Sequence, residues 1–406
     1  MKQLSTLLAL VLGFTLSAQT TNISFTHGGC NIQGVIDMPP GNGPHPAIVL
    51  VSGSGQNDRD TRIHLAPNQN INCLYPGLVG DTVYPLRDLG QLLSDSGYAV
   101  LRYDDITISC PNYAGPFSFE NVFLIGMSAL DYLKTRSDID TNQLILAGHS
   151  EGAMIVSVMA NRRNDVKAII SVAGNRTPLD SILKTQLIDI ADSCGGDSAA
   201  AALQGQQVID YFNQVRQQNY TGLPPFAGLS PQEWNTYINA ADSVAILYDQ
   251  AQLPALFLGF EKDFNVPSSE LFRFQQETTG GHDFYLIPEL NHYLTPPNHP
   301  RVPRSLGDTI VYWLRDALLS NPTFTQTEVN AASIYPNPHQ SDLHVKSDKP
   351  FTLLQLTNMA GVVVYRQTFG KANQCHIESA AHPSGVYLLS IRYADGSEER
   401  IRVVKQ

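Results

Sequence analysis

Short, continuous apolar runs alternate with segments of helical hydrophobic period through the central part of the chain, and this alternation limits the possible folds more than any other feature. Residues 47–51, 144–147 and 255–258 carry only apolar side chains. Strands buried on both faces of a parallel sheet have this composition, because helices cover both faces. The full set of strand-like runs is 47–51, 99–101, 144–147, 168–172, 255–258 and 284–287. We therefore expect an α/β fold with a mostly parallel, doubly wound sheet.

Helical segments are expected between most of these runs, near 85–96, 117–136, 153–163, 267–279 and 305–319. Before the first run, residues 22–37 have the pattern of a hairpin that turns at Gly28-Gly29. The interval from about 175 to 250 breaks the alternation, since it contains helix formers and a turn-rich stretch but no strand-like run. We interpret this interval as a helical cap inserted over the sheet.

The first 18 residues have the pattern of a secretory signal peptide. Lys2 gives a positive start, residues 7–16 are apolar, and Ser17-Ala18 supply small residues for cleavage. The apolar run is about half of the roughly 20 residues that a membrane-spanning helix needs. No other stretch is long and apolar enough to cross a bilayer, so we expect no transmembrane segment.

The composition changes after residue 320. Residues 321–333 have the polar, proline-containing composition of a linker, which ends a main domain of residues 19–320. Residues 334–406 alternate polar and apolar side chains in short runs separated by turn residues. This pattern predicts a small C-terminal all-β sandwich.

Charge and cysteine content exclude some functions. The formal net charge is −11, which argues against nucleic acid as a partner because phosphate binding requires a basic face. Export permits disulfides, and we expect one or two structural bridges or free buried thiols among the five cysteines. The four central cysteines allow three pairings. No C-x-x-C pair occurs, so we expect no metal site and no cofactor.

The segment Gly148-His149-Ser150-Glu151-Gly152 is a G-x-S-x-G motif. It directly follows the strand-like run 144–147 and precedes helix-forming residues 153–160, which is the strand–turn–helix context that the motif requires. In such a turn the serine hydroxyl projects above the edge of the sheet, and small neighbours allow strand and helix to approach closely. We predict Ser150 as a catalytic nucleophile.

A serine nucleophile needs a base that is held by a third group, and in this kind of fold the acid and then the histidine follow the serine. Asp263 follows the strand-like run 255–258, and acids at the carboxyl ends of strands face the crevice where such sites lie. We predict Asp263 as the acid, with Glu261 as the second candidate. His292 follows the next run, 284–287, and is predicted as the base.

Other histidines fit the role of the base less well. His149 lies inside the serine motif and is expected to pack beside the turn. His282 precedes its strand instead of following it, and His299 lies in a proline-rich loop. The remaining histidines of this domain precede the serine in chain order: His27, His45 and His64.

Attack by the serine creates an oxyanion, which needs N–H donors already in place. One donor should be the backbone N–H of Glu151, the residue after the nucleophile. The second should come from the glycine-containing loop after residue 51, and we assign it to Ser54, with Gly53 as the alternative. In the same loop, we expect Asp58-Arg59-Asp60 to anchor the loop through ion pairs; the alternative is that this segment binds a substrate carboxylate.

With these motifs, residues 23–319 resemble a bacterial α/β-hydrolase, a serine hydrolase with a cap insertion. The matching segments are VLVSGSGQNDRD, VLRYD, LILAGHSEGAMI, LFLGFEKDFNVP and LIPELNHYL. The resemblance implies metal-independent hydrolysis of an ester, thioester or amide through an acyl-serine intermediate. Two positions depart from the family pattern: Ser52-Gly53 stands where many relatives have His-Gly, and Asp104-Asp105 leads into a loop without the usual Arg-Gly run.

The tail resembles the C-terminal sorting domain of proteins that leave the cell through the type IX secretion system. The matching pieces are Tyr335-Pro336-Asn337-Pro338, residues 385–389 and the terminal Arg402-Val403-Val404-Lys405. The resemblance implies that residues 334–406 bind the secretion machinery and that the protein crosses the periplasm and outer membrane to be released or attached to the surface. The alternative from pattern alone is a carbohydrate-binding sandwich.

Together these features predict an exported serine hydrolase that cleaves carboxylic esters. A serine peptidase or thioesterase on the same triad remains an alternative, as does a non-catalytic surface binding protein on a hydrolase scaffold. The expected partner of the main domain is a small-molecule or peptide acyl substrate.

Overall fold

A computed structural model describes residues 18–67, 69, 72–113, 118–319, 332–336, 340–358, 363–383, 385–395 and 398–405. The predicted signal peptide, except for Ala18, and most of the predicted linker lie outside these described residues. None of the helices within the described ranges has the length and hydropathy needed to cross a bilayer.

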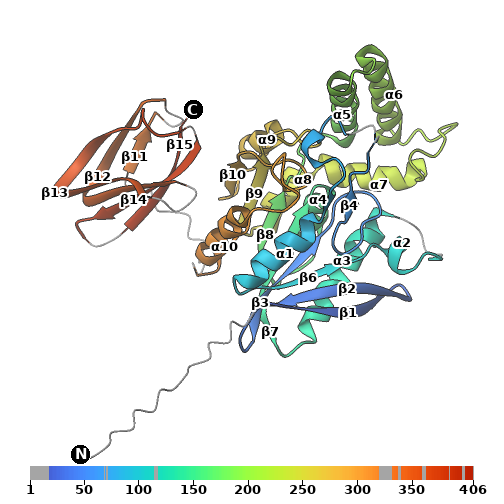
Figure 1. The fold of residues 1–406 in the computed structure, drawn as a ribbon, viewed down its shortest axis with the longest axis horizontal. Coiled ribbons are helices and arrows are strands. Elements are labelled where there is room, and N and C mark those ends of the chain that lie inside the picture. Colours follow the sequence, from blue (N-terminus) through green and yellow to red (C-terminus); the bar gives the residue numbers. More distant parts are fainter. Residues whose placement is uncertain are drawn as a thin grey trace, which may run out of the picture.

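The main domain is built on one eight-stranded sheet with the order β1-β2-β6-β3-β7-β8-β9-β10 (Figure 1). The first pair forms the predicted hairpin, and β2 pairs with β6 in antiparallel fashion. From β6 onward all neighbours are parallel, which confirms the predicted mostly parallel sheet. The strands are β1 Gln19–His27, β2 Cys30–Met38, β3 His45–Val51, β6 Ala99–Tyr103, β7 Ile139–His149, β8 Val166–Val172, β9 Ala255–Phe260 and β10 Asp283–Ile287.

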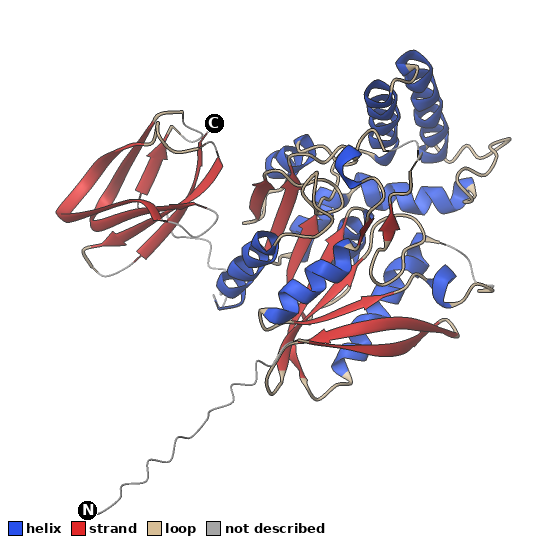
Figure 2. Cartoon of the chain, in the orientation of Figure 1, coloured by secondary structure: helices blue, strands red, loops and turns tan. Residues whose placement is uncertain are grey.

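Helices cover both faces of this sheet, as the doubly wound pattern predicts (Figure 2). One face packs against α1 Pro85–Asp95 and α10 Arg304–Leu319. The other face packs against α3 Phe119–Lys134, α4 Glu151–Asn161, α8 Val244–Ala251 and α9 Ser269–Glu277. The continuous apolar runs therefore mark strands that are buried from both sides.

The interval between β8 and β9 contains α5 Leu179–Cys194, α6 Ser198–Arg216 and α7 Pro231–Asp242, followed by α8. Local sequence sets where these helices begin and end. The Asp197 side chain accepts hydrogen bonds at the start of α6, and Ser230 and Glu233 form a reciprocal capping box at the start of α7. Gly195 ends α5 in the left-handed conformation that glycine adopts without strain.

Loops after β3 and β6 carry short elements. These are β4 Ile63–His64, β5 Thr82–Val83, the 3-10 turn η1 Pro76–Leu78 and the short helix α2 Ile106–Ser109. Strands β4 and β5 pair with each other and lie outside the main sheet.

The C-terminal region forms the predicted all-β unit, in which every pair of strands is antiparallel. Residues 343–345 and 351–356 belong to one long strand, β12. Pro350 interrupts the pairing of β12, and the register shifts there, which lets the strand continue through a residue that cannot donate a hydrogen bond. The strands are β11 Ala332–Tyr335, β12 Asp342–Asn358, β13 Val363–Glu378, β14 Gly385–Tyr393 and β15 Glu398–Lys405.

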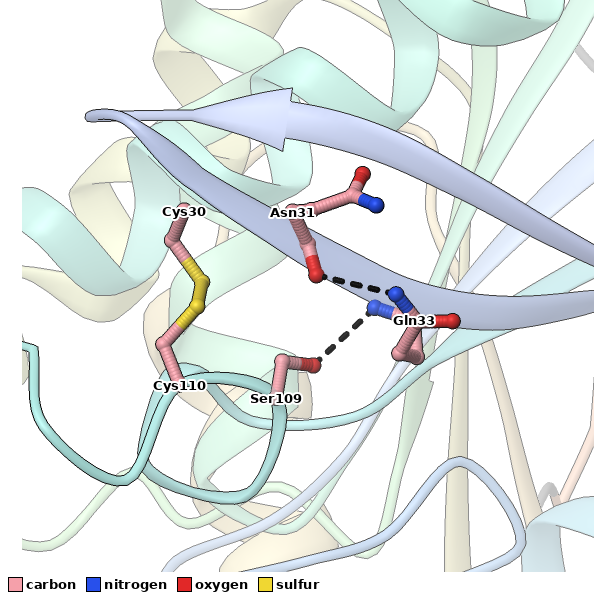
Figure 3. Close-up of a disulfide and its surroundings, with 5 residues drawn as sticks. All are labelled: Cys30, Asn31, Gln33, Ser109 and Cys110. Atoms are coloured by element: carbon pink, nitrogen blue, oxygen red, sulfur yellow. Dashed lines mark hydrogen bonds between the residues drawn. A yellow bond between two sulfur atoms is a disulfide. The ribbon is translucent and has the colours of Figure 1, made fainter.

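Two disulfides cross-link the main domain. Cys30 at the start of β2 is bonded to Cys110 just after α2, and the nearby backbone N–H of Gln33 donates to Ser109 Oγ at 3.0 Å (Figure 3). Cys73 is bonded to Cys194 at the end of α5, so the second bridge ties the inserted helices to the loop before η1. Cys375 is a free thiol.

Candidate active site

Ser150 lies at the turn between β7 and α4 with φ 56° and ψ −121°, a conformation that is strained for a residue with a side chain. Its backbone N–H donates to the carbonyl of Val172 on the neighbouring strand at 2.8 Å. A Cβ atom on Gly148 would overlap the carbonyl oxygen of Gly152, and one on Gly152 would overlap that of Val51. The two glycines of the motif are therefore required by the close approach of strand and helix.

Asp263 and His292 lie in direct contact at the carboxyl ends of β9 and β10. The Nδ1 atom of His292 is 2.8 Å from Oδ2 of Asp263, and both side chains are buried. The other carboxylate oxygen accepts the backbone N–H of Val266 at 2.9 Å. This arrangement can hold the imidazole with its proton on Nδ1 and leave Nε2 free to accept another proton.

His149 of the G-x-S-x-G motif contacts the turn that carries His292. The rings of His149 and His292 are 4.8 Å apart between centroids, and Nε2 of His149 is 2.9 Å from the backbone oxygen of His292. Among the hydrogen bonds of the described residues there is none between the Ser150 hydroxyl and His292. Catalytic hydrogen bonds are often long without substrate and shorten when substrate binds.

The two candidates for the second oxyanion donor differ in their surroundings. A Cβ atom added to Gly53 would lie 3.0 Å from Cβ of Ser150 and 3.3 Å from the backbone oxygen of His149. Ser54 is exposed, and its backbone oxygen accepts a hydrogen bond from the Asn57 side chain at 3.0 Å. Gly53 thus packs directly against the nucleophile turn, whereas Ser54 lies one residue further out.

The loop after β3 is fixed by ion pairs. The guanidinium of Arg59 binds both carboxylate oxygens of Asp104, with Nε–Oδ1 at 2.9 Å and Nη2–Oδ2 at 2.7 Å. Arg59 also donates to the backbone oxygen of Gly34 at 3.0 Å. Two-point pairing of this kind uses the guanidinium fully, so the geometry favours the interpretation of Arg59 as a loop anchor over a substrate reader.

Two further carboxyl groups at the site were missed from sequence. Asp105 accepts the backbone N–H of Asn57 at 2.6 Å, and burial, followed by a smaller contribution from the charge of Glu151, raises the pKa of Asp105 to about 7. Burial also raises the pKa of Glu151, against a hydrogen bond from the Tyr237 hydroxyl of α7 that lowers it. Nothing in the local sequence marks either carboxyl as buried, since the groups around them come from distant parts of the chain.

Aromatic side chains of the inserted helices pack mainly on one another. The ring of Trp234 lies 5.1 Å from Phe212 and 5.3 Å from Tyr237 between centroids, and its indole N–H donates to the backbone oxygen of Phe226 at 2.7 Å. Trp234 and Tyr237 are buried. These contacts belong to the core of the inserted segment.

Among the residues that the structure describes, no group of three or more His, Cys, Asp or Glu side chains is arranged as a metal site.

Comparison with known families gives two matches. Residues 127–312 match the family described as "BAAT / Acyl-CoA thioester hydrolase C terminal", a range that contains Ser150, Asp263 and His292. Residues 333–405 match the "Secretion system C-terminal sorting domain", which confirms the sorting domain inferred from the tail motifs.

The chain is also similar to individual proteins. Esterase EstD from Thermotoga maritima is 24% identical over 298 residues, which is 70% of this chain and 65% of that esterase's length. An esterase domain from a Rhodothermus marinus protein is 15% identical and covers 73% of this chain and 98% of its own, with a TM-score of 0.44. The Pyrococcus horikoshii acylaminoacyl peptidase is 13% identical, with a TM-score of 0.46. The match covers 74% of this chain and 42% of the peptidase chain.

Proposed function

We propose that this chain, an α/β-hydrolase that carries a secretion-system C-terminal sorting domain, is an exported serine hydrolase that cleaves carboxylic esters through an acyl-serine intermediate. The observation that carries the proposal is the 2.8 Å contact between Asp263 and His292 at the edge of the sheet where the strained turn presents Ser150. An ordered acid, base and nucleophile at one sheet edge is the arrangement that acyl transfer requires.

In the first step, Oγ of Ser150 attacks the acyl carbon while Nε2 of His292 accepts the hydroxyl proton. Asp263 holds the opposite edge of the imidazole and stabilises the imidazolium that forms. The negative charge on the former carbonyl oxygen is bound by the backbone N–H of Glu151 and by a second N–H from Gly53 or Ser54.

In the second step, the C–O bond to the leaving group breaks and His292 returns the proton to the departing alkoxide. The acyl group is now an ester of Ser150. Water then attacks this ester, again with His292 as the base, and releases the carboxylic acid and the free serine.

An ester substrate is supported by the similarity to the Thermotoga esterase, whose own length the chain covers only in part. The match to a thioester hydrolase family supports a thioesterase as the second candidate, since the same atoms can expel a thiolate. A peptidase would use the same triad and protonate a leaving amine. A non-catalytic binding protein on this scaffold is the remaining alternative.

The sorting domain supports export through the type IX secretion system, with residues 334–406 as the part that the machinery recognises. The mature hydrolase would then act outside the cell or on its surface. Two disulfides in the main domain are compatible with an oxidising compartment.

The test is turnover of p-nitrophenyl acetate and butyrate by the full chain, its Ser150→Ala variant and a Ser157→Ala control. Ser157 is a buried serine on α4 whose hydroxyl donates to the carbonyl of Met154. We expect Ser150→Ala to lose on the order of 10³-fold or more in kcat, and Ser157→Ala to retain activity. A fluorophosphonate probe that labels the wild-type chain but not Ser150→Ala would support the nucleophile. Absence of Ser150-dependent labelling would favour the binding protein.

A further inference from the structure

His149 stands next to the nucleophile, and its ring is almost wholly enclosed, with 4% of the residue exposed. Its Nε2 atom lies 2.9 Å from the backbone oxygen of His292. Because a carbonyl oxygen can only accept, Nε2 of His149 must carry the proton, which leaves Nδ1 with a lone pair. That Nδ1 atom has no hydrogen-bond partner among the described residues.

The charge state of His149 agrees with this tautomer. Burial, with a further contribution from His292, lowers the pKa of His149 to about 3. The ring is therefore neutral throughout the pH range in which a serine hydrolase works. It does not compete with His292 for a proton, so its contribution has to come from the hydrogen bond and from packing.

We propose that His149 is a positioning residue for His292: its Nε2–H holds the backbone carbonyl of the base and thereby sets the distance between the imidazole of His292 and the nucleophile. This inference rests on the proposed function, because it assigns His292 as the base. Its hydrogen bond and its ring contact are both made to His292, so we infer that it acts through that residue.

The turn that carries His292 has a strained backbone, so it needs contacts that stabilise it. Glu289 and Leu294 on either side of it have positive φ values of 59° and 61°, which cost about 1–3 kcal/mol each in residues with side chains. Strained backbone persists only where surrounding contacts over-determine it. Asn291 supplies some of these contacts by accepting the N–H of Tyr293 at 2.9 Å. The bond from His149 adds one at His292 itself.

His149 also lies against the other two functional loops. It is bonded in sequence to Ser150, and a Cβ atom added to Gly53 would lie 3.6 Å from its Nδ1. The ring of His149 therefore contacts the turn of the base and would be in contact with a side chain placed at Gly53, in the loop proposed to supply an oxyanion donor. Leucine would fill comparable space without the cost of burying a polar ring, and the bond to His292 is the contact that offsets this cost.

Glutamine and asparagine variants of His149 distinguish a positioning role from simple space filling, because their amide groups reach different distances. In His149→Gln the amide N–H reaches about as far as Nε2, whereas in His149→Asn it is one methylene too short for the carbonyl of His292. His149→Leu removes the donor altogether. His282→Leu is the matched control. The side chain of His282 is also buried, but it precedes β10, whereas the turn that carries His292 follows β10.

We expect His149→Asn and His149→Leu to lower kcat for p-nitrophenyl butyrate by about 10- to 100-fold with KM changed less than about threefold, since small misplacement of a reacting group has effects of this size. His149→Gln should recover most of kcat, and the His282→Leu control should keep it. The second readout is the downfield proton resonance of the His292 Nδ1–H that bonds Asp263. It should persist in the wild type and His149→Gln and broaden or vanish in His149→Asn and His149→Leu.

If His149→Asn and His149→Leu keep both kcat and the downfield resonance, His149 does not position the base. Equal losses in His149→Gln and His149→Asn would also overturn the proposal, because they would point to ring packing. Failure of the proposed function looks different: the wild-type chain would show no Ser150-dependent turnover, while the resonance would still report whether His149 orders His292. If His149→Leu does not fold, the Gln and Asn pair decides the question.

Discussion

The carboxylate of Asp263 is held by two partners at once: Oδ2 faces Nδ1 of His292 at 2.8 Å, and Oδ1 accepts the backbone N–H of Val266 at 2.9 Å. The carboxylate cannot rotate without breaking one of these bonds. The imidazole is therefore offered an acceptor in one fixed position, which favours the tautomer with the proton on Nδ1. In the proposed mechanism, Asp263 orients His292 as the base and does not itself need to take up a proton.

Replacing this carboxylate tests its role. Asp263→Asn should lower kcat by about 10³- to 10⁴-fold with little change in KM, because the amide favours the wrong tautomer of His292. The control is Glu261→Gln, which alters the other candidate acid, a half-exposed side chain paired with Lys262. Steady-state kinetics on p-nitrophenyl esters would show a loss confined to Asp263→Asn. A larger loss in Glu261→Gln would transfer the role to that residue.

A methyl group at position 53 should disturb the oxyanion loop. In Gly53→Ala the new Cβ would lie 3.0 Å from Cβ of Ser150, so the loop or the nucleophile has to shift. We expect kcat/KM to fall by about 10- to 100-fold. Gly281→Ala is the control, since its Cβ would meet no atom within 4 Å. Kinetics together with a melting curve for each variant separate loss of alignment from loss of folding. Unchanged kcat/KM in Gly53→Ala would show that this loop does not approach the reacting atoms.

Asp105 should make stability depend on pH. Burial raises its pKa from 3.8 to about 7 in the folded chain, so between these values the folded state binds more protons than the unfolded state. The free energy of unfolding therefore falls as pH rises through this window, and the destabilisation is complete above pH 7. Asp105→Asn should be more stable than wild type at pH 8, by about 1–3 kcal/mol, with a smaller difference at pH 5.

Urea unfolding of wild type and Asp105→Asn at both pH values measures this difference. Asp140→Asn is a control in which the pKa shift has the opposite sign. The N–H of Asn142 lowers the pKa of Asp140, so the charged form of this carboxyl is favoured. That variant should gain nothing at pH 8. A difference for Asp105→Asn that is the same at pH 5 and pH 8 would mean that its carboxyl is ionised throughout.

The two disulfides should differ in their effect on activity. Removing either bridge as a double alanine variant should cost about 2–5 kcal/mol, since the bridged residues are 121 and 80 positions apart. Only loss of Cys73–Cys194 should also raise KM. This bridge holds the inserted helices to the loop of Tyr75, whose ring stacks on Tyr293 at 4.5 Å. Melting curves and KM values of the two double variants test the contrast, and equal KM values would contradict it.

The strands and the nucleophile turn could be predicted because their determinants are local. A strand buried from both sides has to be apolar along its length, and β7 and β9 show this in four consecutive residues each. The turn at Ser150 needs glycine on both sides because carbonyl oxygens of Gly152 and Val51 occupy the space of a side chain. Local composition therefore carries the information.

Groups that depend on distant partners could not be predicted in the same way. The bond from His149 to His292 joins residues 143 positions apart. The raised pKa of Asp105 follows from burial and, to a smaller extent, from the charge of Glu151, which is distant in sequence. Cysteine pairing likewise remained open between three possibilities, because nothing in the spacing distinguishes them. Within β12, a shift in the register of pairing accommodates Pro350, a residue that cannot donate a hydrogen bond to the ladder.

After the end of β8, the chain forms helices α5 to α7 and then enters α8. Helix α8 packs along α4 and leads to the first residue of β9. Because β8 and β9 are adjacent parallel strands, the unit β8–α8–β9 would be a complete crossover without the excursion. An exchange of the excursion alone would leave the strand order, the strained serine turn and the carboxylate–imidazole pair untouched. If the proposed function holds, the inserted helices can change among related chains, and substrate range with them, while the residues proposed for catalysis stay the same.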